Sequence, residues 1–147
     1  MDTTLLPPDF REFLRLLNSN NVEYLIVGGY AVGYHGYPRP TGDLDIWISN
    51  TRDNAKRVLR ALEEFGFACP IALLLQENQV FRMGIPPLRI EVITTIDGVR
   101  FPDCYSERVQ DEIDGIQVNV ISLARLRENK RATGRLKDAA DLEHLRP

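Results

Sequence analysis

The stretch over residues 24–48 places the strongest constraint on how this chain folds. It reads YLIVGGYAVGYHGYPRPTGDLDIWI, with an apolar and partly β-branched start, a glycine pair, and an Asp-Leu-Asp-Ile-Trp-Ile end. Residues 24–27 are typical of a buried strand, and Gly28-Gly29 allows a sharp turn and the close approach of a ligand to the backbone. We expect a short helix over residues 30–34, followed by a loop and a second strand that carries the two aspartates.

The glycine pair and the two aspartates predict a phosphate and metal site. The backbone N–H groups directly after Gly28-Gly29, at the start of the short helix, lack partners within it and favour an anion such as phosphate. On a strand, Asp43 and Asp45 share one face, with side chains about 6.5–7 Å apart. Neighbouring carboxylates repel unless they share a proton or a cation, and Mg²⁺ binds carboxylates together with substrate phosphates. The expected ligand is therefore a nucleoside triphosphate with a divalent metal.

Composition predicts an ordinary globular protein. The 147 residues are 44% hydrophobic and 27% charged, which fits one domain over residues 1–147 with its own core. The formal net charge of −3 argues against a strongly basic nucleic-acid binder. Cys69 and Cys104 are too few for a disulfide framework and read as small buried apolar residues. The sequence has neither a signal peptide nor a membrane-length apolar run, so we expect a cytoplasmic protein without a membrane partner.

Hydrophobic periodicity and capping residues predict the remaining elements. The expected helices are bounded by Pro7 and Asn18, by Thr51 and Gly66, by Ser122 and Thr133, and by Arg135 and Leu145. The expected strands cover residues 79–83, 88–93 and 112–121; residues 99–105 read as irregular, and residues 71–75 as a short helix or a connection. The expected fold is α/β (α+β), with a small mixed, mainly antiparallel sheet and helices largely on one side.

Glu91 lies within one of these expected strands, where it shares a face with Arg89. An acidic side chain in an otherwise apolar strand is costly to bury unpaired, so Glu91 needs a partner. Two interpretations follow. Glu91 either joins Asp43 and Asp45 as a third carboxylate of the site, or forms an ion pair with Arg89 or Arg82 on an edge strand.

The order of these motifs resembles a known superfamily. Gly28-Gly29, a short helix and then Asp43-x-Asp45 are similar to the nucleotide-binding signature of DNA polymerase beta-type nucleotidyltransferases. In that superfamily a third carboxylate lies on a neighbouring strand, and Glu91 matches it by order, although many relatives have aspartate there. Many members also have serine where this chain has Gly29.

Two further segments resemble small bacterial members of that superfamily. Arg39-x-Thr41, directly before the aspartates, is similar to nucleotidyltransferase-like toxins of type IV toxin–antitoxin systems. Arg39 is either a phosphate-binding group or a surface arginine. The C-terminal helix of small members carries a pattern like Lys137-Asp-x-x-Asp141. Lys130 and Lys137 lie two helical turns apart and could reach the β- and γ-phosphates, whereas a Lys137–Asp141 ion pair on a solvated helix is the alternative.

The resemblance implies a mechanism and leaves the acceptor open. Asp43, Asp45 and Glu91 would hold two Mg²⁺ ions, or Mn²⁺, and Glu91 would also help to deprotonate the attacking hydroxyl. The nucleotide would be bound by the glycine bend, Tyr30, Arg39, Thr41, Lys130 and Lys137. The acceptor could be RNA, in particular tRNA, a partner protein of a toxin–antitoxin pair, or a small molecule. The alternative is a nucleotide-binding regulator or antitoxin that has the fold without turnover.

Overall fold

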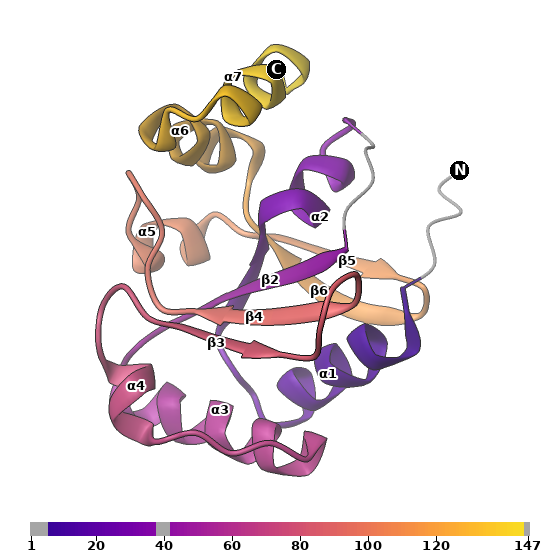
Figure 1. The fold of residues 1–147 in the computed structure, drawn as a ribbon, viewed down its shortest axis with the longest axis vertical. Helices are drawn as coiled ribbons and strands as arrows, with labels where there is room; N and C mark the ends of the chain where they lie inside the picture. The colour runs from indigo at the N-terminus through magenta and orange to yellow at the C-terminus, as the bar shows by residue number, and fades with distance from the viewer. Residues whose placement is uncertain (1–5, 38–41, 146–147) are drawn as a thin grey trace.

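The computed structural model describes residues 6–37 and 42–145. These residues form a six-stranded sheet with helices around it (Figure 1). The elements in chain order are α1 (Pro8–Ser19), β1 (Tyr24–Val27), α2 (Gly28–Tyr34), β2 (Asp43–Ile48), α3 (Arg52–Phe65), α4 (Ile71–Leu75), β3 (Val80–Met83), β4 (Arg89–Ile93), α5 (Phe101–Ser106), β5 (Val109–Ile113), β6 (Ile116–Val120), α6 (Leu123–Thr133) and α7 (Leu136–His144).

The strand order across the sheet is β3-β4-β2-β1-β6-β5. Neighbouring strands are antiparallel in the pairs β3/β4, β2/β1 and β6/β5, and parallel in the pairs β4/β2 and β1/β6. The predicted mixed, mainly antiparallel sheet is therefore confirmed. Because β1 and β2 are the two central strands, the residues at the end of β1 and the start of β2 are fixed by neighbours on both sides.

The hydrophobic core lies between the sheet and the layer of α1, α3 and α4, which occupy one side of the sheet in Figure 1. The predicted apolar face of α1 is buried there, with Phe10, Phe13, Leu14 and Leu17 fully inaccessible. Helix α3 begins where the Thr51 side chain accepts a hydrogen bond from the N–H of Asn54. The helices α6 and α7 lie on the other side of the sheet from α3 (Figure 1).

Three local expectations need correction. Helix α2 begins at Gly28 itself rather than after the glycine pair, because β1 ends directly at Val27. The segment predicted to be irregular contains α5, whose Phe101 packs edge-on against Trp47 with ring centroids 5.1 Å apart. The last hairpin begins at Val109, earlier than expected, because β5 pairs with β6 along its whole length. No helix formed by residues 6–37 and 42–145 is long and apolar enough to span a membrane.

Candidate functional site

Four charged residues lie side by side on one face of the neighbouring strands β2 and β4. Strands β2 and β4 run parallel, with Asp43 opposite Arg89 and Asp45 opposite Glu91. Residues paired in this way point to the same face, and their strands lie about 4.8 Å apart. The alternate residues, such as Leu44 and those flanking Glu91, are buried on the opposite face. The sheet register therefore brings Asp43, Asp45 and Glu91 to one face of the sheet.

Asp45 is the carboxylate most affected by this arrangement. Burial raises the pKa of Asp45 to about 6, and the negative charges of Glu91 and Asp43 contribute to the increase. The positive charges of Lys137 and Lys130 act in the opposite direction. The three acids are thus close enough to repel each other, and two lysines from the helical side reach the same electrostatic environment.

Arginines neutralise part of this cluster. Arg89 donates a hydrogen bond of 2.9 Å from Nη2 to Oδ2 of Asp43, and its Nε lies 3.2 Å from Oε2 of Glu91. Arg82 from the edge strand β3 donates a hydrogen bond of 3.1 Å to the same oxygen of Glu91. Glu91 therefore lies beside Asp45 and forms ion pairs with both arginines.

The close contact between Gly28 and Asp45 fixes the position of this carboxylate. Gly28 directly follows Val27, the last residue of β1 and the partner of Asp45 in the sheet. Its φ is +67°, and a Cβ atom at this position would lie 2.1 Å from Oδ2 of Asp45. Only glycine adopts this conformation readily and leaves the space that the carboxylate fills. The backbone bend and the aspartate thus form one unit, and the group that approaches Gly28 closely is the carboxylate of Asp45, whereas the sequence predicted a ligand there.

The chemistry of the cluster fits a divalent cation, although its present arrangement does not enclose one. Three neighbouring carboxylates supply the hard oxygen ligands that Mg²⁺ and Mn²⁺ prefer, and a cation would relieve the repulsion that raises the pKa of Asp45. Within residues 6–37 and 42–145, however, no three His, Cys, Asp or Glu side chains are grouped closely enough to hold a metal ion. The guanidinium of Arg89, a cation of the chain itself, joins Asp43 to Glu91 instead.

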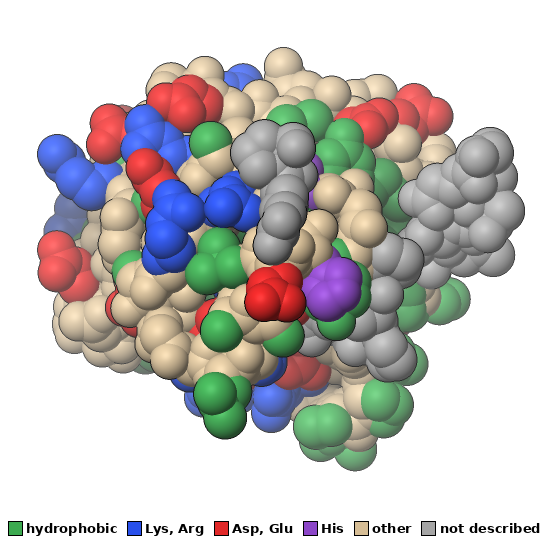
Figure 2. All heavy atoms as spheres, turned by 90° about the horizontal axis from the view of Figure 1, so that it is seen from above, with side chains coloured by type: hydrophobic (Ala, Val, Ile, Leu, Met, Phe, Trp, Pro, Cys, Tyr) green, Lys and Arg blue, Asp and Glu red, His purple; other side chains and the backbone are tan. Residues whose placement is uncertain are grey.

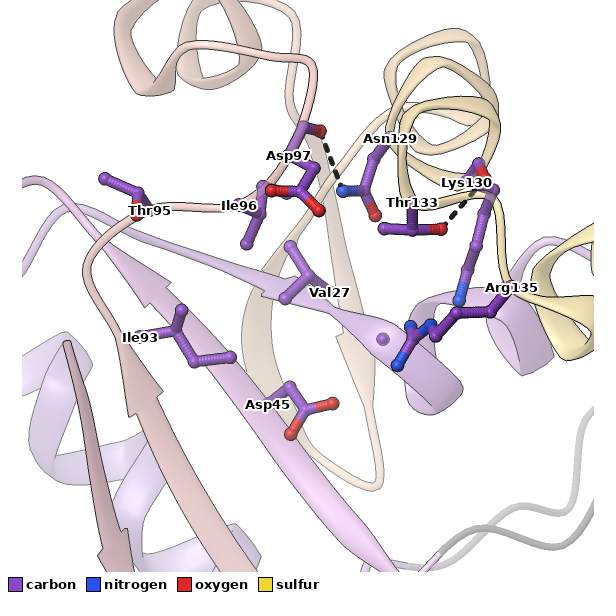
Figure 3. A pocket seen from close by; sticks show the side chains of 11 residues that line it. Val27, Asp45, Ile93, Thr95, Ile96, Asp97, Asn129, Lys130, Thr133 and Arg135 are labelled. Carbon is purple, nitrogen blue, oxygen red and sulfur yellow. Dashed lines mark hydrogen bonds between the residues drawn. The ribbon is translucent and has the colours of Figure 1, made fainter. Parts of the chain in front are cut away.

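A cavity of about 350 Å³ opens beside Asp45. It lies between the ends of the central strands and the helices α6 and α7, with Asp45 on the strand side and Lys130 and Arg135 on the helix side (Figure 3). Its lining consists of Val27, Gly28, Asp45, Ile93, Thr95, Ile96, Asp97, Asn129, Lys130, Thr133 and Arg135. Of the three acids, Asp45 is the one that lines this cavity, and Lys130 and Arg135 are the basic residues on the opposite wall.

Lys130 is held by a buried ion-pair network that joins α6 to α7. Its ammonium lies 3.0 Å from Asp138 and 3.3 Å from Asp141, and all three side chains are at most 4% exposed. Asp138 also accepts hydrogen bonds from Arg135 and Thr133. Burial alone would raise the pKa of Asp138, but the hydrogen bonds from Arg135, Thr133 and Lys130 outweigh it and lower that pKa. Lys130 therefore lines the cavity as part of this network rather than as a flexible ammonium.

Other predicted site residues have different positions. Lys137 is exposed on α7, and its charge lowers the pKa of Asp45. Gly29 lies in the first turn of α2. Tyr30 packs edge-on against Phe10 of α1, with ring centroids 5.8 Å apart, and does not line the cavity. Arg39 and Thr41 lie outside the described residues.

Apart from Lys130, sequence reasoning did not identify the residues of the cavity's helical wall. Arg135 donates a hydrogen bond of 2.6 Å to Asp138 while 61% of its side chain remains exposed. Asn129 donates a hydrogen bond of 2.9 Å to the carbonyl of Asp97, which holds the turn after β4 against α6. Gly98 in that turn lies so close to α6 that a Cβ would meet Ala132 at 2.5 Å. Two features of the sequence could have indicated this wall: the Asp97-Gly98 turn, and the i,i+3 spacing that allows Arg135 to pair with Asp138.

The face that carries α6 and α7 mixes basic and acidic side chains. Lys and Arg lie directly beside Asp and Glu over the described part of this face (Figure 2). Arg125, for example, pairs with both Glu107 and Glu128. Basic side chains on this face are thus paired with acidic ones, and the face is not uniformly basic.

Comparisons with solved structures support the fold. A candidate nucleotidyltransferase from Thermotoga maritima is similar over 96% of this chain and 94% of that protein, with a TM-score of 0.64 and 18% identity. An antigenic nucleotidyltransferase-like protein from Paracoccidioides brasiliensis is similar over 95% of this chain and 75% of that protein, with a TM-score of 0.51 and 22% identity. At these identities the likeness concerns the fold alone.

Comparison with protein families is more specific. No curated protein matches the sequence significantly. The model of the aminoglycoside-2''-adenylyltransferase family, in contrast, matches residues 9–145, which include the whole acid cluster and both C-terminal helices. The chain therefore belongs to the aminoglycoside-2''-adenylyltransferase family, within the nucleotidyltransferase superfamily.

Proposed function

We propose that this protein is a metal-dependent nucleotidyltransferase that moves a nucleoside monophosphate from a nucleoside triphosphate to an acceptor hydroxyl. The observation that carries the proposal is the gathering of Asp43, Asp45 and Glu91 on one face of the sheet, beside a cavity with basic residues on its other wall. The raised pKa of Asp45 supports it, because repelling acids at a cavity are typical of a site built for a cation.

The reaction requires one bond exchange at phosphorus. The acceptor oxygen forms a bond to the α-phosphorus, the bond from this phosphorus to the bridging oxygen of the leaving pyrophosphate breaks, and the hydroxyl proton leaves the acceptor. Asp43, Asp45 and Glu91 would hold Mg²⁺, which supplies positive charge to the phosphate oxygens when bound. Glu91, on the strand beside Asp45, would accept the hydroxyl proton directly or through water.

The remaining residues would bind the triphosphate. The first backbone N–H groups of α2, directly after Gly28, would bind a phosphate, because N–H groups at a helix start favour anions. Lys137 and the exposed guanidinium of Arg135 would neutralise charge on the leaving pyrophosphate. Lys130, with both aspartates already around it, would act by fixing α7 over the cavity.

The acceptor belongs to one of three chemical classes. The name of the family points to a small-molecule hydroxyl, such as that of an aminoglycoside. The likeness of the Arg39-x-Thr41 segment to type IV toxins points to tRNA or to a partner protein of a toxin–antitoxin pair. We place the small molecule first, because the face around α6 and α7 is not uniformly basic, as an RNA-binding surface would be.

A transfer assay tests the proposal. The protein is incubated with each α-labelled nucleoside triphosphate, Mg²⁺, and an aminoglycoside, tRNA or cell lysate as acceptor. We expect label on one acceptor class, and at least a hundredfold loss with Asp45→Asn, because one oxygen ligand and one charge are removed. Full metal-dependent activity in this variant would contradict the mechanism.

A non-catalytic nucleotide-binding regulator or antitoxin is the alternative function. The observation that favours it is the Arg89 bridge, since the described residues do not enclose a metal in this arrangement. Nucleotide binding without transfer to any acceptor would support this alternative. The two functions are distinguished by whether bound, labelled triphosphate releases pyrophosphate when an acceptor is added.

A further inference from the structure

Arg89 occupies an unusual position for a positively charged residue. Its guanidinium forms ion pairs with Asp43 at 2.9 Å and with Glu91 at 3.2 Å, two members of the acid cluster that lie on different strands. Its side chain is 29% exposed, and its buried Nε atom lies within ion-pair distance of Glu91 without making a hydrogen bond to the described residues. The guanidinium thus lies between the two carboxylates, and its Nε atom makes no hydrogen bond to either of them.

The contact of Arg82 with the same cluster is different in kind. Arg82 reaches only Glu91, at 3.1 Å, from the edge strand, and its side chain is 57% exposed. A half-exposed ion pair is weakened by water and salt, whereas a partly buried one is screened less. Each arginine therefore places one positive charge beside the acid cluster, but of the two only Arg89 pairs with both Asp43 and Glu91.

We propose that Arg89 is the resident counter-cation of the acid cluster and competes with the divalent metal for Asp43 and Glu91. The proposal rests on the metal-dependent function given above. It explains why three neighbouring carboxylates do not form a metal-holding group among the described residues: two of them are joined by a guanidinium. Binding of the metal then requires Arg89 to release the oxygens that it contacts.

This competition has two linked consequences. Without metal, Arg89 stabilises the fold, because it reduces repulsion among carboxylates that the sheet register forces together. With metal, the same contacts must be lost, so part of the binding free energy is used to displace the guanidinium. Removing Arg89 should therefore lower the stability of the metal-free protein and raise its affinity for metal, both in one variant.

The test uses Arg89→Gln with Arg82→Gln as the matched control, because each removes one positive charge from the cluster. Mn²⁺ alone, without nucleotide, is titrated into the full chain, and free Mn²⁺ is measured by electron paramagnetic resonance. We expect Arg89→Gln to bind Mn²⁺ about tenfold more tightly than the unmodified protein. Arg82→Gln should change the affinity by no more than about twofold, because its contact is half exposed.

Thermal unfolding provides a second readout. In the presence of a chelator, Arg89→Gln should unfold at a lower temperature than Arg82→Gln, and added Mn²⁺ should reverse the order. Equal Mn²⁺ affinities for the two variants, or an unchanged affinity in Arg89→Gln, would overturn the proposal while leaving metal binding intact. If no form of the protein binds Mn²⁺, even with a triphosphate present, the proposed metal-dependent function fails together with it.

Discussion

At the scale of single residues, the position of the Asp45 carboxylate requires a glycine at position 28. The carboxylate of Asp45 fills the space where a side chain at position 28 would begin, and the left-handed backbone of Gly28 turns β1 into α2 at that point. The raised pKa of Asp45 shows that the carboxylate is held where it is partly deprived of water. The site thus depends on one glycine as much as on its acids.

Replacing Gly28 with alanine should therefore damage both stability and function. The new Cβ would lie 2.1 Å from Oδ2 of Asp45, and φ at this residue is +67°. We expect a loss of about 2 kcal/mol in the free energy of unfolding, from the backbone penalty and the displaced carboxylate, together with loss of nucleotidyl transfer. Denaturant unfolding and the transfer assay measure the two effects.

Gly33→Ala is the control for this substitution. Gly33 lies in the same helix, and an added Cβ would meet nothing within 4 Å. Alanine there should leave stability unchanged or raise it by up to about 1 kcal/mol, because alanine favours the helix more than glycine does. Equal effects at positions 28 and 33 would show that the contact with Asp45 is not what restricts this position.

At the scale of elements, α7 is attached to the rest of the protein mainly through charge. Its buried residues are Asp138 and Asp141, and both lie close to the ammonium of Lys130 on α6. A ring stack between Tyr37 and His144, with centroids 3.9 Å apart, adds a contact to the segment after α2. Helix α7, which carries Lys137, is therefore held over the cavity by polar contacts that a single substitution can remove.

Lys130→Met tests this attachment. Methionine would leave two buried carboxylates without their shared cation, which typically costs about 3 kcal/mol or more. We expect faster hydrogen exchange of the backbone amides of α7, and weaker triphosphate binding because Lys137 is no longer positioned. Both are measured on the same protein, by mass spectrometry and by calorimetry.

Lys137→Met removes the positive charge of α7 near the cavity without disturbing the ion pairs of Lys130 that attach this helix. Lys137 is exposed, so its removal should change the stability by less than about 0.5 kcal/mol and leave the exchange of α7 unaltered. It should still weaken triphosphate binding if Lys137 contacts the phosphates. If Lys130→Met leaves α7 as protected as in the unmodified protein, the network does not hold the helix.

The elements differ in how well the sequence predicts them. Strands and long helices follow from periodicity and caps, as Thr51 and Ser122 show by accepting the expected hydrogen bonds. Helix α5 was not predicted because it is short and its packing against Trp47 comes from a distant part of the chain. The partners of Lys130 were not predicted either, because they lie on the next helix, beyond the left-handed turn at Gly134.

At the scale of the whole molecule, the acid cluster stores free energy that opposes folding. The sheet register forces Asp45 next to Glu91 and Asp43, and burial together with their charges raises the pKa of Asp45 to about 6, well above the usual value for an aspartate. Arg89 offsets part of this repulsion by pairing with both neighbours. A protein that did not need these carboxylates would be more stable without them, which is the usual relation between a functional site and stability.

This relation predicts how global stability depends on pH. Between about pH 4 and pH 6 the folded protein retains a proton on Asp45 that the unfolded chain releases, so stability decreases as the pH rises through this window. Below pH 4 both states are protonated and the contribution of Asp45 to stability is complete. Above pH 6 it is lost, and the loss amounts to about 3 kcal/mol for a shift of this size.

Asp45→Asn removes this titration while keeping the shape of the side chain. We expect the variant to exceed the unmodified protein in free energy of unfolding by up to about 3 kcal/mol at pH 7.5, and to match it near pH 4. Urea unfolding across this range, with a chelator to remove metal, measures the difference. A difference that does not depend on pH would mean that Asp45 is not the titrating group. A variant that is more stable at neutral pH and inactive in transfer would show that the same repulsion serves the site and weakens the fold.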